Sequence, residues 1–275
     1  MRRTAVLLLT AVLAAGCSTT RTPAPPAPST SSAAPTEAPT RAAPPPAAPR
    51  DGTCHDLTYT EAVAPTARSS DVACGDEHTS QTFHVGTLDR VVGGRLLAVD
   101  ARRLQDEAAA ECPDRLAELL GGTEEQRRLS MLRSVWFTPT VGQSDRGADW
   151  LRCDAVAVAG PETLLPLAGP LGGVLDTEAG RERYGMCGTA EPGTGGFERV
   201  ACATRHSWRA LRTVGLPDGD YPGQEVAQAA GETPCTDAGR AAADDPLDFQ
   251  WGYEWPTAEQ WAAGQTYGIC WAPDA

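Results

Sequence analysis

The stretch VACGDEH at residues 72–78 recurs as VACATRH at residues 200–206. A Gly-x-Cys precedes both copies, ending at Cys54 in the first and at Cys187 in the second. One short match can arise by chance, whereas a matched set in one order indicates an internal repeat. The sequence therefore predicts two copies of one small unit.

Each copy ends on a second shared pattern. Pro139 and Pro256 each begin a Pro-Thr pair and stand fourteen residues before Cys153 and Cys270. A glycine and an aromatic residue occupy the same places in between. We expect repeat 1 over 51–159, a connector over 160–183 and repeat 2 over 184–275. Mixed helical and strand patterns in each copy predict the α+β class, as two small tandem disulfide-stabilised domains.

Eight cysteines, four in each copy, remain once Cys17 is set aside. An even number of cysteines in an exported chain is typical of a disulfide framework. Repeat symmetry and the short first loops predict four pairs within the repeats. These are Cys54–Cys74, Cys112–Cys153, Cys187–Cys202 and Cys235–Cys270.

The chain starts with a pattern typical of export. Two arginines precede an apolar run of twelve residues, too short to span a bilayer. Residues 13–17, LAAGC, resemble a bacterial lipobox, which implies cleavage before Cys17 and diacylation of its thiol. We therefore expect a signal peptide over 1–17 and a lipid anchor at the extracytoplasmic face of the cell membrane. The alternative is an ordinary signal peptide cut nearby.

Residues 18–50 are expected to form a disordered tether. Ten of these 33 residues are proline, and most of the others are alanine, serine or threonine. Such a composition cannot bury a core and favours polyproline II. The tether would hold the folded part away from the membrane.

The folded part is strongly acidic. Residues 51–275 hold 18 arginines, no lysine and 35 acidic residues, a formal net charge of −17. Nucleic-acid binding needs clustered positive charge, so we expect no nucleic-acid partner.

Local patterns predict most elements. We expect a helix over 101–111 capped by Asp100, a second short helix from Pro113, and a weak helix over 224–230. Thr257 and Gln260 predict a capping box for one more short helix. The strand candidates are 82–86, 131–137, 150–158, 197–202, 207–214, 249–255 and 267–271. The apolar residues of the connector have no regular helical or strand spacing, although its leucines favour packing on a domain.

The repeated motifs resemble the septum formation domain of high-GC Gram-positive bacteria. The resemblance is carried by residues 72–78 and by the pattern Trp255-Pro-Thr, Trp261, Gly264 and Cys270. It covers both repeats and implies a membrane-attached envelope protein linked to division. Repeat 2 lacks the acidic segment before its histidine, and Ser144 replaces the tryptophan in repeat 1. The two copies would therefore not be equivalent binding sites.

His78 and His206 each follow a cysteine by four residues. Two Cys-x3-His units could supply four zinc ligands, or each could form a catalytic Cys–His pair. A bridged cysteine can be neither thiolate ligand nor nucleophile. We therefore expect structural histidines beside the disulfides, with metal binding as the weaker alternative and no cofactor.

No reactive constellation stands out in the sequence. Adjacent acids occur at 106–107, 124–125 and 244–245, where solvated faces or turns are the simpler interpretation. There is no Gly-x-Ser-x-Gly elbow, phosphate loop or His-Glu-x2-His pattern. We expect a protein that is not an enzyme.

Six tryptophans and tyrosines fall within residues 251–271. Such side chains dominate binding surfaces but also fill cores. The candidate binding residues are Tyr253, Trp255, Trp261 and Trp271. The sequence thus predicts a lipid-anchored envelope module that binds a wall polymer or an envelope protein. The alternatives are an envelope enzyme acting on the wall and an extracytoplasmic binder of solutes or metal.

Overall fold

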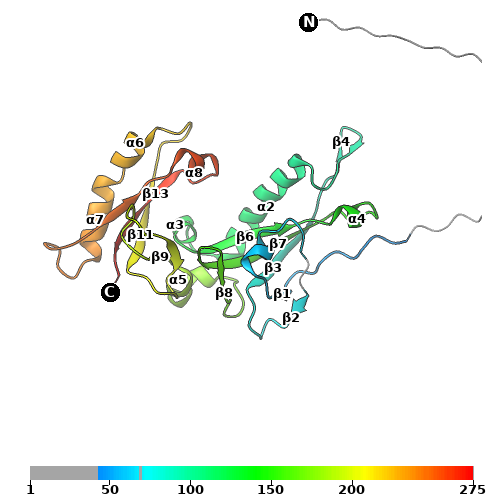
Figure 1. Cartoon of the computed structure of the whole chain (residues 1–275), viewed down its shortest axis with the longest axis horizontal. Coiled ribbons are helices and arrows are strands. Elements are labelled where there is room, and N and C mark those ends of the chain that lie inside the picture. Colours follow the sequence, from blue (N-terminus) through cyan, green and yellow to red (C-terminus); the bar gives the residue numbers. More distant parts are fainter. Residues whose placement is uncertain (1–42, 68–69, 275) are drawn as a thin grey trace, which may run out of the picture. The chain divides into compact units, whose positions relative to one another are not determined.

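Two antiparallel sheets form the framework of the computed structural model, which describes residues 43–67 and 70–274 (Figure 1). The first sheet has the order β2 (Asp71–Val72), β1 (Cys54–His55), β3 (Ser80–Thr87), β7 (Trp150–Gly160), β6 (Leu132–Phe137). The short strand β8 (Thr163–Leu165) also pairs with β7. The second sheet has the order β10 (Arg199–Ala201), β9 (Met186–Gly188), β11 (Trp208–Gly215), β13 (Tyr267–Pro273), β12 (Gly252–Glu254).

Apart from β8, the strands of the two sheets match one for one, and each sheet has an irregularity at the matching place. The register of β3 on β7 shifts between Thr82 and His84, and that of β11 on β13 shifts between Ala210 and Arg212. These positions stand at the same distance from the two Cys-x3-His motifs. We call residues 51–159 the first half and 184–274 the second half.

Each sheet carries a long helix pinned by a disulfide. Helix α2 (Arg102–Leu120) buries Leu104, Ala108 and Cys112 against the first sheet. The two short helices expected here are in fact one, because Pro113 lies on the exposed face and leaves only a solvent-side carbonyl without its helical donor. Asp100 is not the cap; the helix starts after Ala101, which makes no side-chain capping bond.

The second half has an equivalent helix, α7 (Glu232–Ala242), that the sequence analysis did not predict. Proline, threonine and glycine within ETPCTDAGRAA hide its helical character. Its buried residues include Cys235, which is bonded to Cys270 on β13.

Four short helices begin with a threonine capping box. They are α1 (Tyr59–Ala62), α3 (Glu124–Arg128), α4 (Val141–Ser144) and α8 (Ala258–Ala262). The box of α8, formed by Thr257 and Gln260, confirms the prediction, and Thr140 with Gln143 repeats it in the first half.

The remaining strand and helix predictions are confirmed within a few residues, except that β12 covers only the centre of 249–255. Helix α6 (Gln224–Ala229) matches the expected weak helix. The remaining elements are β4 (Val91–Val92), β5 (Arg95–Leu96), the 3-10 turn η1 (Val174–Asp176) and α5 (Glu178–Tyr184).

Four disulfides join the pairs that repeat symmetry predicts. They are Cys54–Cys74, Cys112–Cys153, Cys187–Cys202 and Cys235–Cys270. Each bond therefore closes a loop within one half.

The two halves pack against each other through a shared core. Met131 and Val158 of the first half pack with Met186, Trp208 and Trp271 of the second. An isolated β-bridge pairs Ser130 with Gly185. The connector is ordered, and its Leu167, Leu171 and Leu175 fill the first half's core. Residues 43–275 consequently form one compact unit, and the expected separation into two domains stays a prediction.

The export signal over 1–17, including Cys17, and most of the expected tether over 18–50 lie outside the described residues. Residues 43–50 have no regular secondary structure. No helix in the described part of the chain has both the length and the apolar character needed to cross a membrane.

Candidate functional site

The two Cys-x3-His motifs form matching corners. The Nδ1 atom of His78 donates to the Asp76 carbonyl at 2.8 Å, and that of His206 donates to the Thr204 carbonyl at 2.7 Å. Each ring is thus fixed by the backbone two residues before it, at the turn that follows a disulfide cysteine.

The corner of the second half contains a potential metal cluster. One ligand atom each from Cys187, His206 and Asp274 lies within 4.8 Å of the others. However, the Cys187 sulfur is already in a disulfide, and Asp274 accepts a 2.6 Å bond from Arg209 Nε. Both ring nitrogens of His206 already have partners, the Thr204 carbonyl at 2.7 Å and Asp274 at 3.1 Å. This donor set does not fit zinc, which binds thiolate and neutral imidazole.

His78 lies in the other half, so the two histidines are not brought together. It is 1% exposed, and its Nε2 atom has no hydrogen-bond partner among the described residues. The geometry places His78 in the core and not in a ligand site.

A buried polar cluster lies in the first half, on the sheet face opposite α2. Asp154 accepts 2.7 Å hydrogen bonds from Ser80, Thr82 and Arg152 Nε. His55 Nε2 contacts the Thr82 hydroxyl at 3.1 Å. Ser80 bonds the carboxylate directly and not the imidazole, so these residues do not form a Ser–His–Asp relay. Asp154 is fully buried, and the cluster holds the sheet together.

The adjacent acids singled out in the sequence have surface roles where the structure gives them contacts. Arg102 and Arg103 lie one helical turn from Asp106 and Glu107, at 3.9 and 3.0 Å. Glu125 accepts a hydrogen bond from the Thr213 backbone at 2.9 Å and so links the two halves.

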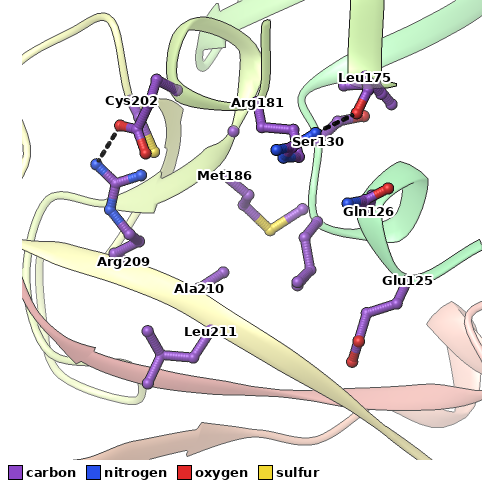
Figure 2. A pocket seen from close by; sticks show the side chains of 13 residues that line it. Glu125, Gln126, Ser130, Leu175, Arg181, Met186, Cys202, Arg209, Ala210 and Leu211 are labelled. Carbon is purple, nitrogen blue, oxygen red and sulfur yellow. Dashed lines mark hydrogen bonds and ion pairs between the residues drawn. The ribbon is translucent and has the colours of Figure 1, made fainter. Parts of the chain in front are cut away.

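A cavity lies at the junction of the halves (Figure 2). Its volume is about 240 Å³, and Met186, Ala210 and Leu211 supply apolar surface. Its arginine side chains already have partners within the protein. Arg209 pairs with Glu182 at 3.0 Å, and Arg181 donates to the Leu175 carbonyl at 2.8 Å. We regard it as a packing gap at the junction.

The predicted aromatic residues divide into buried and accessible groups. Trp271 has no exposed surface and packs edge-on against Phe197 at 5.2 Å, so it cannot contact a ligand. It is a core residue because β13 lies in the middle of the sheet, with this side chain facing the other half. Tyr253 is partly exposed, but its hydroxyl is buried with no hydrogen-bond partner among the described residues, and burial raises its pKa to about 12.

Trp261 is held by the loop that follows β11. Its indole N–H donates to the Gly219 carbonyl at 3.2 Å, and its ring meets Tyr221 at 5.8 Å. The Tyr221 hydroxyl in turn donates to the Pro256 carbonyl. Trp261 therefore positions a loop.

Trp255 lies in an open groove of about 590 Å³ between β12 and the helices α6 and α7. Trp251 and the ring of Tyr253 also line it, as do Pro192 and Gln228. Three acidic residues complete the lining, and none forms an ion pair with a described residue: Glu191, Glu225 and Glu232. We call this the aromatic groove. Its flat apolar rings and free carboxylates suit a ligand with apolar faces and many hydroxyl or ammonium donors.

A family model described as septum formation matches residues 51–270, which include both sheets and all four disulfides. The chain belongs to the septum formation family. This membership supports a division-related role in the cell envelope. Neither the curated proteins nor the solved structures compared with the chain contain a match.

Sequence reasoning found the aromatic side chains of this groove but not its acidic wall. Glu191 is 60 residues from Trp251 in sequence, and only the folding of the second half brings both to one groove. Glu225 and Glu232 lie on α6 and at the start of α7, and the latter helix had no recognisable sequence signal.

Proposed function

We propose that this protein is a lipid-anchored, non-enzymatic binding module that acts in septum formation and binds the cell-wall polymer through the aromatic groove. The groove carries the proposal, because it combines an accessible tryptophan with carboxylates that no described cation neutralises. Polysaccharide rings offer apolar faces for stacking, and their hydroxyls donate hydrogen bonds to carboxylates.

The anchoring part of the proposal is supported by the export pattern and by Cys17. Diacylation provides two chains, which is enough for stable membrane attachment. Replacing Cys17 by serine should move the protein from the membrane fraction to the soluble extracytoplasmic fraction. Retention of the Cys17→Ser protein in washed membranes would refute the lipid anchor.

The repeat structure supports a further part of the proposal, namely that the halves are two copies of one ancestral unit. The matching strand orders, shifted registers and disulfides argue for it. The copies have diverged, since the matching groove of the first half, which Gln105 and Trp136 line, has no acidic residue among its described lining residues.

Co-sedimentation with purified cell-wall sacculi tests the binding role. We expect the full chain, kept soluble in a non-ionic detergent, to pellet with sacculi, and Trp255→Ala to weaken retention about tenfold or more, as removal of a hot-spot aromatic does. Trp261→Ala is the matched control, because this tryptophan lies outside the groove and packs on the loop around Gly219 and Tyr221.

Two outcomes would overturn the proposal. If Trp255→Ala and Trp261→Ala bind sacculi as the unaltered chain does, the groove is not the binding site. If the purified chain releases soluble wall fragments, it is an enzyme and not a binding module.

A further inference from the structure

Four arginines gather along a second groove, between α2 and β6 of the first half and the 263–267 segment of the second. They are Arg127, Arg128, Arg133 and Arg199. The groove has a volume of about 570 Å³, and all four side chains are partly buried. We call it the arginine groove. Its charge is unexpected in a folded part whose formal net charge is −17.

Two of these arginines already have carboxylate partners. Arg199 bonds Glu254 through Nε at 3.0 Å and also reaches the Gln265 side chain. Arg128 pairs with Glu124 at 2.5 Å and lies over the Tyr267 ring, 4.4 Å from its centre. These pairs position their guanidinium groups at the groove wall.

The other two have no carboxylate partner among the described residues. Arg133 uses Nη1 to bind the Ser130 and Leu132 carbonyls at 2.8 and 2.7 Å, and no described residue accepts from its Nε or Nη2. Arg127 likewise donates only to the carbonyls of Gly121 and Gly122. Each therefore brings a positive charge to the groove that its own contacts leave uncompensated.

Arg133 and Arg199 line the same groove, so the positive charge of one acts on the other. Burial lowers the pKa of the Arg133 guanidinium, and the Arg199 charge lowers it further, whereas Tyr267 opposes the shift. Arginine stays protonated in spite of such shifts. The folded protein thus retains a repulsion that a bound anion would relieve.

We propose that the arginine groove binds the phosphate group of an anionic ligand, with Arg133 and Arg127 as its main contacts. A guanidinium fork matches two oxygens of an oxyanion, and several such forks around one space match a group with more than two oxygens and more than one negative charge. A carboxylate has only two oxygens and one charge. This site is separate from the aromatic groove in residues and in ligand chemistry, so either can fail without the other.

Isothermal titration of the full chain, in non-ionic detergent and at constant ionic strength, tests the site with pyrophosphate as the probe. We expect saturable binding that Arg133→Gln weakens at least about tenfold, since charge-assisted hydrogen bonds to an oxyanion are lost. Arg133→Lys keeps the charge but not the fork and should give an intermediate affinity. Arg102→Gln is the matched control, because Arg102 on α2 is 94% exposed and lies outside the groove.

A second readout separates binding from a structural role. The unaltered chain and Arg133→Gln are melted with and without pyrophosphate. A ligand contact predicts that pyrophosphate raises the melting temperature of the variant less than that of the unaltered chain, whatever the loss of the Ser130 and Leu132 bonds does to the variant alone. If this variant does not fold, Arg127→Gln removes the other uncompensated charge and should lower affinity by a similar factor.

Three results would overturn the proposal. The first is the absence of saturable pyrophosphate binding by the unaltered chain. The second is equal affinity in folded Arg133→Gln or Arg127→Gln. The third is binding of the tricarboxylate citrate as tight as that of pyrophosphate, which would make the groove a general anion site.

Discussion

Equivalent positions of the two sheets carry polar side chains in the first half and apolar side chains in the second. On β7, Arg152 and Asp154 flank the disulfide Cys153, while on β13 Ile269 and Trp271 flank the disulfide Cys270. The neighbouring strands differ in the same way. Ser80 and Thr82 stand on β3 where β11 has Trp208 and Ala210.

The two sheet faces differ in what their side chains contact. In the first half, a carboxylate, a guanidinium and two hydroxyls satisfy one another inside the sheet face. In the second half, the apolar face packs on Met131 and Val158 of the other half. The same backbone therefore supports a polar face that is complete within its half and an apolar face that needs a neighbour. The apolar face has become the junction.

Asp154→Ala should have the largest effect. It leaves the Arg152 charge and two hydroxyls buried without their acceptor, and breaking a buried ion pair costs about 3–5 kcal/mol. Urea unfolding followed by circular dichroism would measure the loss. Asp106→Ala is the control, because Asp106 is 71% exposed, and should change stability by less than about 0.5 kcal/mol. Equal values for both variants would show that the polar cluster does not stabilise the first half.

Removal of the equivalent disulfides should destabilise the halves by similar amounts. The Cys112–Cys153 and Cys235–Cys270 bonds span 41 and 35 residues. The chain-entropy account gives about 4 kcal/mol for loops of either length. Double alanine variants, compared by thermal unfolding under oxidising conditions, test this. Clearly different losses of stability in the two variants would mean that the polar and apolar cores, and not loop closure, determine the loss.

Thr82→Val should show a smaller loss, about 1–3 kcal/mol, because it removes one hydrogen bond to Asp154 and the buried contact of His55 Nε2. Thr87→Val on the same strand is exposed and provides the control. Denaturant midpoints measure both. If Thr82→Val were neutral, the first half would tolerate an apolar residue there, as the second half does with Ala210.

The smallest expected effect is that of acid on the first half, through His55. Burial lowers the pKa of His55 below its ordinary value of 6.5, and the Arg152 charge adds to this, while Asp154 and Asp71 oppose it. Below pH 6.5 the unfolded chain therefore binds a proton that the folded chain does not, so stability falls as pH falls from 6.5 towards the lowered value. His55→Asn should flatten that part of the profile of stability against pH. An unchanged slope would assign the effect to other groups.

Short-range patterns predicted much of the fold. The repeated cysteines fixed the disulfide pairs, and Thr257 with Gln260 predicted a real capping box. Helix α7 escaped prediction because Cys235 and its bond to β13, and not local propensity, hold it in place. The prediction that a new helix starts at Pro113 was wrong, because here the surroundings of the helix outweigh the local preference of proline. A proline that usually starts a helix is tolerated within one whose exposed side faces water.

The candidate sites could also be predicted only in part from the sequence. A run of aromatics was visible in the sequence, but whether each ring faces the core or solvent depends on its strand's place in the sheet. Trp271 on central β13 is buried, whereas Trp255 just beyond edge strand β12 is not. The arginine groove left no local signal, because Arg127, Arg133 and Arg199 come from segments that only the folded halves bring together.

The placement of the disulfides also has a mechanical consequence. Every one of the four closes a loop inside a half, and none ties Met131 or Ser130 to the segment around Gly185 that they meet. A pulling force applied at opposite ends of this unit would meet two disulfides in each half but none across the junction. Tension between the halves is therefore carried by the connector's backbone and by non-covalent packing, whereas each half is braced from within.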